Sequence, residues 1–176
     1  REILKSFLQV ISDASDYGFS VNHSSPYSYI GYGGAWLRFH KPLEFLTTIL
    51  NIQDDDKDKT NKIVAYARKV GVDIRSISFG KSRASYALNR EEKAVYKGIA
   101  SIKYLNRNVA EELYELAQQK EYDKGDFVTL LRDIFDTCTI DTRQMEILIR
   151  LDFFKDFGAK EILLELFLTM ADKKKA

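Results

Sequence analysis

The residue types that most often carry catalysis or bind metals are few in this chain and widely spaced. The two histidines, His23 and His40, lie seventeen residues apart, and no His-x-x-x-His pair occurs, so a histidine-based metal site is not expected. The single cysteine, Cys138, lies among apolar residues with no cationic neighbour to lower its pKa. This setting favours a buried structural thiol over a nucleophile.

Acidic and glycine-rich segments give no active site either. The aspartate-rich run 54–58 has the oxygen ligands that a divalent cation prefers. It lacks the spaced ligands and the glycine of a calcium loop, which favours a solvated linker that helps to cap the following helix. Neither G-x-x-x-x-G-K-[ST] nor G-x-G-x-x-G is present, and the glycines at 31–34 are typical of a helix contact or a turn. No catalytic residue and no metal ligand is therefore predicted.

Clustered Lys and Arg are the feature that points to binding chemistry. The 176 residues carry 27 Lys and Arg against 26 Asp and Glu, a net charge of +1 that excludes a histone-like basic tail. Residues 59–107 nevertheless hold twelve basic residues and three acidic ones. Such a cluster is typical of a surface that contacts phosphate, and equally of a solvated helix face beside a hairpin.

Helices are expected to position these residues, because no proline follows Pro42. Apolar spacing predicts helices over 2–13, 26–39, 42–50, from Asp58 or Thr60 to Arg68, and near 107–120, 127–136, 140–151 and 159–171. The expected N-terminal caps are Asp58 or Thr60, Asn106 or Asn108, Asp126, and Thr139 or Asp141. Gly71 is expected to end its helix, and Gly158 is expected to separate the last two helices.

An extended stretch is predicted near 72–79, and segments 85–88 and 94–97 flank 89–93 as a short β-hairpin. The fold class is therefore mainly α with a small β-hairpin. The longest apolar runs are too short to cross a bilayer, so no membrane partner is expected. No long internal repeat is apparent. The expected core of the C-terminal part includes Leu113, Leu116, Leu130, Leu131, Ile134, Ile147, Leu148, Leu151, Phe154, Leu163 and Phe167.

Several motifs, in order along the chain, resemble a segment of the bacterial replicative DNA polymerase III alpha subunit, a C-family DNA polymerase. The first runs from Tyr17-Gly18-Phe19 to Tyr32, and the second is Ala35-Trp36-Leu37-Arg38-Phe39-His40-Lys41-Pro42-Leu43-Glu44-Phe45. Further along, Tyr96-Lys97-Gly98-Ile99-Ala100-Ser101-Ile102-Lys103 is similar to the entry of that family's helix-hairpin-helix. The likeness covers roughly residues 5–170. The resemblance is inferred mainly because the motifs follow one another in the same order as in that family.

The resemblance implies distal fingers helices followed by a tandem helix-hairpin-helix unit. It assigns residues 1–75 to the fingers and residues 76–176 to a DNA-binding region. In that family the catalytic aspartates lie in an upstream palm. The fragment is therefore not expected to be an enzyme or to hold a cofactor, although Mg²⁺ is expected in the parent palm of a DNA-directed DNA polymerase. The start at Arg1 is interpreted as a cut in a longer protein.

For the fingers, the resemblance implies nucleotide- or template-facing roles for Ser20, Asn22, His23 and Tyr27. The family pattern has Asn-Lys where this chain has Ser20–Val21, and valine offers no cation to a triphosphate. His23 lies in a polar segment that we expect to be a loop, where it would donate to a phosphate oxygen. Tyr27 would stack on a base or sugar, or else pack against a helix.

For the hairpin, the family's Gly-Val-Gly is replaced here by Tyr104–Leu105–Asn106. Asn106 is the more tolerant of a positive φ, whereas Tyr104 would hinder close approach of a phosphate to the backbone. The residues assigned to DNA-backbone binding are Lys81, Arg83, Lys97, Lys103, Asn106, Arg107 and Asn108.

The function implied is a non-catalytic, cytoplasmic polymerase fragment that binds primer–template DNA without sequence preference. Its expected partners are this DNA, the palm and thumb of the parent polymerase, and other replisome subunits. Two alternatives stay open: a stand-alone or split DNA-binding module, and a degenerate helix-hairpin-helix that docks proteins.

Overall fold

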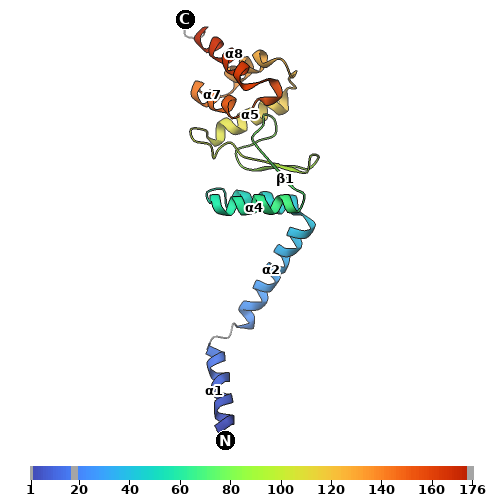
Figure 1. The fold of residues 1–176 in the computed structure, drawn as a ribbon, viewed down its shortest axis with the longest axis vertical. Helices are drawn as coiled ribbons and strands as arrows, with labels where there is room; N and C mark the ends of the chain where they lie inside the picture. Colours follow the sequence, from blue (N-terminus) through green and yellow to red (C-terminus); the bar gives the residue numbers. More distant parts are fainter. Residues whose placement is uncertain (1, 17–19, 174–176) are drawn as a thin grey trace. The chain divides into compact units, whose positions relative to one another are not determined.

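Residues 2–16 and 20–173 are described by the computed structural model shown in Figure 1. The elements are α1 (Glu2–Asp16), α2 (Val21–His40), α3 (Pro42–Ile52), α4 (Lys57–Lys69), β1 (Asp73–Arg75), β2 (Ala87–Asn89), β3 (Ala94–Tyr96), α5 (Arg107–Gln119), α6 (Phe127–Thr137), α7 (Thr142–Arg150), the 3-10 helix η1 (Lys155–Phe157) and α8 (Lys160–Lys173). The mainly helical class with a small hairpin is confirmed. Across these residues, no helix has both the length and the apolar character to cross a membrane.

The packing divides the chain into two units, one with α1 and α2 and one that begins at Pro42. The second unit contains the whole sheet, in which Arg75 of β1 pairs with Tyr96 of β3. Main-chain pairing thus links residues on both sides of the 75/76 boundary. The assignment of residues 1–75 to fingers and 76–176 to the DNA-binding region stays a prediction about function.

In the first unit, the helix expected over 2–13 is present as α1, but α2 begins five residues before Pro26. The expected loop around His23 is therefore wrong from residue 21 onward, and Tyr17–Phe19 lie outside the described residues. The helix tolerates its serines because the Ser28 hydroxyl donates to the Ser24 carbonyl at 2.9 Å, which satisfies it within the helix. Pro26 supplies a helical φ, but it cannot donate to the Asn22 carbonyl, and its ring crowds that carbonyl.

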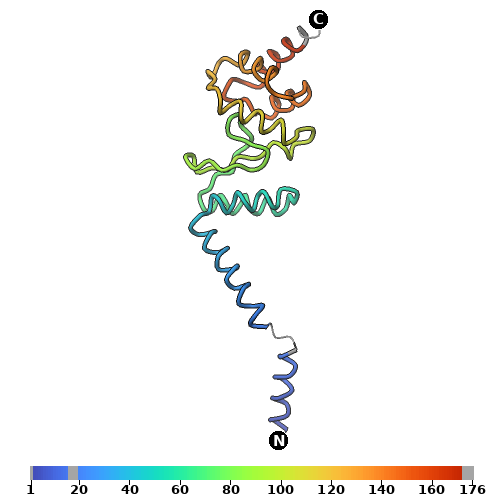
Figure 2. The backbone as a smooth tube through the Cα atoms, turned by 180° about the vertical axis from the view of Figure 1, so that it is seen from behind, coloured from blue at the N-terminus to red at the C-terminus, as the bar shows by residue number. Residues whose placement is uncertain are grey.

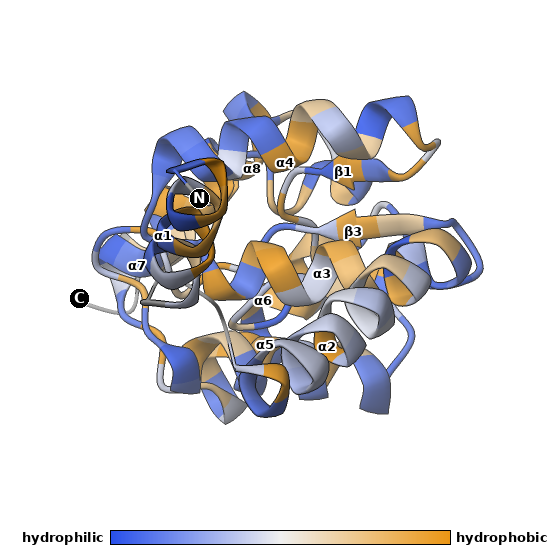
Figure 3. Ribbon diagram, turned by 90° about the horizontal axis from the view of Figure 1, so that it is seen from below, coloured by the Kyte–Doolittle hydropathy of each residue, from blue (hydrophilic) through white to orange (hydrophobic). Residues whose placement is uncertain are grey.

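In the second unit, a three-stranded sheet has the order β1-β3-β2. β3 runs parallel to β1 and antiparallel to β2, so the predicted hairpin is confirmed and the predicted extended stretch supplies a third strand. The central strand β3 is fully buried and largely apolar in the hydropathy view (Figure 3). Val95 of β3 packs with Leu46 and Leu50 of α3 in one hydrophobic cluster.

Helices α3 and α4 lie on one side of this sheet, and α5–α8 lie on the other (Figures 1 and 2). Asp56 caps α4, because its carboxylate accepts from the Lys59 amide at 3.1 Å. The predicted caps Asp58 and Thr60 are wrong: the Thr60 hydroxyl bonds instead to the Gln53 carbonyl at 2.9 Å. The capping role expected for the acidic run is thus present, two residues earlier, and Gly71 follows the helix with φ +75°.

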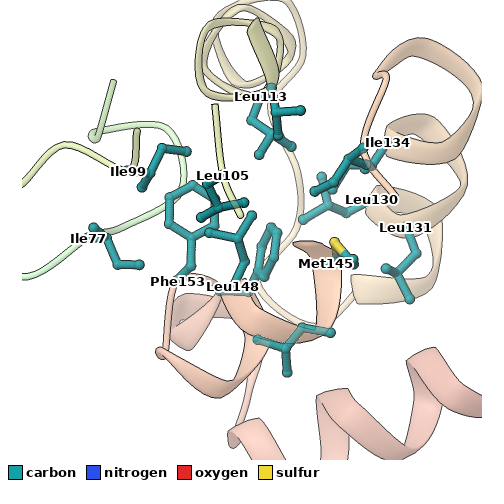
Figure 4. Close-up of a cluster of buried hydrophobic side chains, with 14 of the residues drawn as sticks. Ile77, Ile99, Leu105, Leu113, Leu130, Leu131, Ile134, Met145, Leu148 and Phe153 are labelled. Atoms are coloured by element: carbon teal, nitrogen blue, oxygen red, sulfur yellow. The ribbon is translucent and has the colours of Figure 1, made fainter. Parts of the chain in front are cut away.

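The larger core is built from α5–α8 and the segments that lead into them (Figure 4). Most of the predicted core is buried, but Ile147 is partly buried and Leu151 is 45% exposed. Leu151 leaves the core because it is the C-cap of α7, where the chain turns away. The predicted caps Asn106, Asp126 and Asp141 are confirmed, each accepting a backbone N–H from the third residue of its helix.

Gly98 joins the sheet to the helical layer. A Cβ at this position would lie 2.4 Å from the Ala84 carbonyl oxygen and 2.6 Å from backbone carbons of Ser85. Just beyond Gly98, the Ile99 and Ala100 amides donate to the Arg83 and Ala84 carbonyls, each at 3.0 Å. The turn after β3 is therefore held directly against segment 83–85, and only glycine fits this approach.

We predict that Gly98→Ala lowers the free energy of unfolding by about 1–3 kcal/mol, because the added methyl group forces two backbone segments apart. The measurement is urea denaturation followed by circular dichroism. Gly125→Ala is the matched control, since a Cβ at Gly125 has no neighbour within 4 Å. The free energy of unfolding of Gly125→Ala should be unchanged or higher by up to about 1 kcal/mol. Equal stability of the two variants would contradict the steric argument.

Candidate nucleic-acid interface

The first hairpin is a series of tight turns between β3 and α5. The Ile102 amide donates to the Ile99 carbonyl at 3.2 Å, and the Leu105 amide donates to the Ile102 carbonyl at 3.0 Å. Leu105 at the tip points into the core and is 7% exposed. Asn106 accepts from the Val109 amide at 3.0 Å and so begins α5. The buried leucine and the cap together fix the direction in which the helix leaves the hairpin.

The left-handed residue of this hairpin is Tyr104, with φ +75°. Asn106, the residue type that tolerates a positive φ better, has φ −136° and acts as the N-cap. A tyrosine in this region costs about 1–3 kcal/mol and persists only where its surroundings hold it. Here the Tyr104 carbonyl accepts from Gln144 Nε2 at 2.8 Å, and the ring lies 3.6 Å from the Arg143 guanidinium carbon.

Three of the predicted phosphate contacts lie exposed around this hairpin: Lys97, Lys103 and Arg107. In the part of the chain that the structure describes, none of them pairs with a carboxylate. Lys103 Nζ lies 5.1 Å from the Tyr104 ring centroid, and Arg107 Nη2 reaches Ser85 Oγ at 3.4 Å. Two further predicted contacts are exposed beside them: Asn106, the N-cap of α5, and Asn108 in its first turn. The positive charges of Lys97, Lys103 and Arg107 are therefore available to an external anion.

Lys81 and Arg83, the other two predicted contacts, are instead engaged by glutamates. Lys81 and Arg75 both pair with the carboxylate of Glu92, which also accepts from the Tyr96 hydroxyl at 2.5 Å. Because of the Lys81 hydrogen bond, and then that of Tyr96, the pKa of Glu92 lies below its ordinary value of 4.5.

Arg83 donates two hydrogen bonds to Glu111 Oε2, at 3.0 and 2.6 Å, while Glu111 Oε1 accepts from the Ala84 amide at 3.3 Å. The Arg83 guanidinium also lies 4.8 Å from the Tyr114 ring centroid. The hydrogen bond from Arg83 to Glu111 raises the pKa of Arg83, which keeps the guanidinium charged. Lys81 and Arg83 thus help to fix the sheet and α5 in place.

The second hairpin, between α6 and α7, is occupied by a carboxylate from another helix. Glu112 of α5 accepts from the Thr139 amide at 2.6 Å and from the Thr139 hydroxyl at 2.9 Å. Asp141 and Gln144 then form a reciprocal capping box at the start of α7. The Glu112 carboxylate therefore already occupies the Thr139 donors that an external anion would need.

The two hairpins correspond at a constant offset of thirty-five residues, although the sequence shows no obvious long repeat. Buried Leu105 matches buried Ile140, and each is followed by its helix cap, Asn106 or Asp141. The same offset relates Leu113 to Leu148 in the helices that follow. An apolar residue followed by Asn or Asp, repeated at this spacing, is the signal by which the sequence could have shown the repeat.

The predicted fingers residues lie on α2, in the other unit. Ser20 immediately precedes this helix, and Asn22 and His23 lie in its first turn. His23 and Tyr27, one turn apart, have ring centroids 4.6 Å apart, and Tyr27 is 64% exposed. The helix thus brings the four predicted residues to one end.

The remaining candidate groups are the single cysteine and the acidic and histidine side chains. Burial raises the pKa of Cys138, which disfavours the thiolate that a nucleophile needs. Over residues 2–16 and 20–173, no three His, Cys, Asp or Glu side chains gather into a group able to hold a metal ion. Sequence reasoning missed Arg143, Gln144, Glu92 and Glu112, because most of their partners lie more than ten residues away in the sequence.

Comparison with known proteins identifies the same region. A family model described as a helix-hairpin-helix motif matches residues 71–162, which span the sheet, both hairpins and the start of α8. That match covers more than half of the chain.

The DNA polymerase III subunit alpha proteins of several bacteria are similar over most of the chain. The Deinococcus radiodurans protein is 28% identical over 86% of this chain, and the Campylobacter jejuni protein is 29% identical over 85%. The Escherichia coli K12 protein is 24% identical over 82%. The matched segment is 11% of the first relative and 12% of the other two. The resemblance drawn from the sequence motifs is confirmed.

We predict that Glu92→Gln makes folding less sensitive to acid. Because the folded state lowers the Glu92 pKa, its stabilisation is present above pH 4.5 and is lost as pH falls through the folded-state pKa. The variant should start less stable at pH 7 and lose less stability below pH 4.5. Urea denaturation at a series of pH values measures both effects. Glu91→Gln, exposed in the same turn, is the control, and a Glu92→Gln profile parallel to the wild type would refute the prediction.

Proposed function

The chain belongs to the helix-hairpin-helix motif family, and we propose that it binds primer–template DNA without sequence preference, as a non-catalytic segment of a replicative polymerase of the polymerase III alpha type. The observation that carries this proposal is the group of exposed cations at the first hairpin, Lys97, Lys103 and Arg107. Cations of this kind neutralise backbone phosphates and release counterions from the duplex, which favours binding to any sequence.

The proposal places the phosphate contacts at the first hairpin rather than the second. Glu112 repels an anion at the second hairpin and already occupies the Thr139 amide. At the first hairpin, the amides of Arg107 and Asn108 lie in the first turn of α5 and have no acceptor within the helix. These amides and the three cations supply donors and charge to a sugar–phosphate backbone.

We further propose that α2 contributes to the nucleotide-facing side of the polymerase. The support is the family resemblance together with the exposed His23–Tyr27 pair, since an aromatic ring can stack on a base and an imidazole can donate to phosphate. Ser20 and Asn22 belong to the same proposed surface. The partners would be the palm and thumb of a cytoplasmic parent enzyme and other replisome subunits. The palm would hold the catalytic Mg²⁺.

The proposal predicts a salt-dependent affinity for DNA that ignores sequence. In fluorescence anisotropy titrations of the 176-residue chain, two primer–templates of unrelated sequence should bind equally well. The logarithm of the affinity should fall linearly with the logarithm of salt concentration, with a slope near −0.9 for each phosphate contacted. Lys103→Glu and Arg107→Glu should each weaken binding to both DNAs and reduce the slope by about 1.

Lys124→Glu is the matched control, because Lys124 is exposed in the loop before α6 and makes no ion pair in the described structure. It should change affinity far less than the two hairpin variants. Absence of binding at low salt would reject the proposal and favour a protein-docking role. Equal losses in all three variants would show that net charge, not the hairpin, determines binding.

A further inference from the structure

We propose that Arg143, in the first turn of α7, is a phosphate contact of the first hairpin, so that one DNA-binding surface is built from both hairpin motifs. This inference rests on the proposed DNA binding and adds a contact that the sequence motifs do not indicate. It also gives the second motif a role even though Glu112 fills its own hairpin.

The position of Arg143 is the first support. Its guanidinium carbon lies 3.6 Å from the centroid of the Tyr104 ring, at the tip of the other hairpin. Lys103 Nζ lies 5.1 Å from the same centroid. Two cations from separate motifs therefore share one aromatic ring, and both side chains are exposed. A phosphate beside Tyr104 would meet both positive charges.

Gln144, the neighbour of Arg143, fixes this arrangement. Its Nε2 donates to the Tyr104 carbonyl at 2.8 Å, and its Oε1 accepts from the Asp141 amide at 3.0 Å. Gln144 is only 7% exposed, so both hydrogen bonds are shielded from water. The Gln144 side chain thus attaches the start of α7 to the backbone of the first hairpin, which holds the neighbouring Arg143 beside that hairpin.

The chemistry of the stack leaves Arg143 able to bind. A guanidinium that lies against an aromatic ring uses its flat face, and its five N–H donors remain in the plane, where they suit a phosphate. In the described structure no carboxylate pairs with Arg143. By contrast, Arg150 at the other end of α7 pairs with Glu146 at 2.8 Å. Arg143 is therefore the α7 arginine that is oriented without being neutralised.

The test compares Arg143→Ala with Arg132→Ala in salt-dependent anisotropy titrations of the full chain on primer–template DNA. Arg132 is an exposed arginine of α6 and makes no ion pair within the described residues, so its variant removes the same charge elsewhere. Arg143→Ala should weaken binding about tenfold at low salt and reduce the salt slope by about 1, as expected for one lost phosphate contact. Arg132→Ala should leave both near the wild-type values.

Two further variants separate a binding role from a structural one. Arg143→Gln keeps a long side chain without the charge and should reduce the salt slope by the same amount as Arg143→Ala. This variant still tests the proposal if the alanine variant fails to fold. Arg143→Lys keeps the charge and should retain most of the slope. A folded, DNA-binding protein whose slope is unchanged by Arg143→Gln would overturn this inference while leaving the proposed function intact. A wild-type chain that binds no DNA would instead reject the proposed function itself.

Discussion

The approach of Gly98 to segment 83–85 is the constraint on which the rest of the second unit depends. At this point the chain leaves the buried strand β3 and enters the first hairpin, and a backbone oxygen stands where any side chain would begin. The two amide bonds that follow hold the entrance to the hairpin against Arg83 and Ala84. Glu111 then binds the same two residues from α5, so strand, hairpin and helix share one attachment.

The asymmetry of the two hairpins follows from what the neighbouring helix α5 carries. Both hairpins have a buried apolar residue followed by an Asn or Asp helix cap, so their backbones pack against the core in the same way. Adjacent glutamates on α5 point to different partners: Glu111 holds Arg83, and Glu112 holds Thr139. Glu111 thereby links α5 to the segment before β2, and Glu112 occupies the donors of the second hairpin. Beside Tyr104, Lys103 and Arg143 make no ion pair within the described residues, which is why the proposed binding surface is centred there.

Features set by local chemistry were predictable from the sequence. Asn106, Asp126 and Asp141 cap helices because their carboxylate or amide oxygens reach an amide only three residues away. The hairpin between 85 and 97 follows from alternation and a polar turn. Most of the core follows from helical spacing, with Leu151 as the exception because a helix end, not a helix face, determines its exposure.

Features set by contacts between distant residues were not predictable. From the sequence, Lys81 and Arg83 are expected to be surface cations free to contact DNA. Their carboxylate partners, Glu92 and Glu111, are identified only once the sheet and α5 are in place. The start of α2 was misjudged because serine and glycine favour loops in isolation, whereas here the serine hydroxyls bond within the helix. The positive φ of Tyr104 was not predictable from residue type, which favours asparagine over tyrosine in this region.

The tyrosine at position 104 changes how such a hairpin can hold a phosphate. A glycine there leaves the backbone open, so amide dipoles make the contact and little charge is involved. With tyrosine, the ring stands at the tip, and the positive charges of Lys103 and Arg143 lie beside it. Binding through side-chain cations releases counterions, whereas binding through neutral amides does not. In the proposed binding mode, replacement of the glycine need not abolish DNA binding: the contact would move from the backbone to the side chains and would depend more strongly on salt.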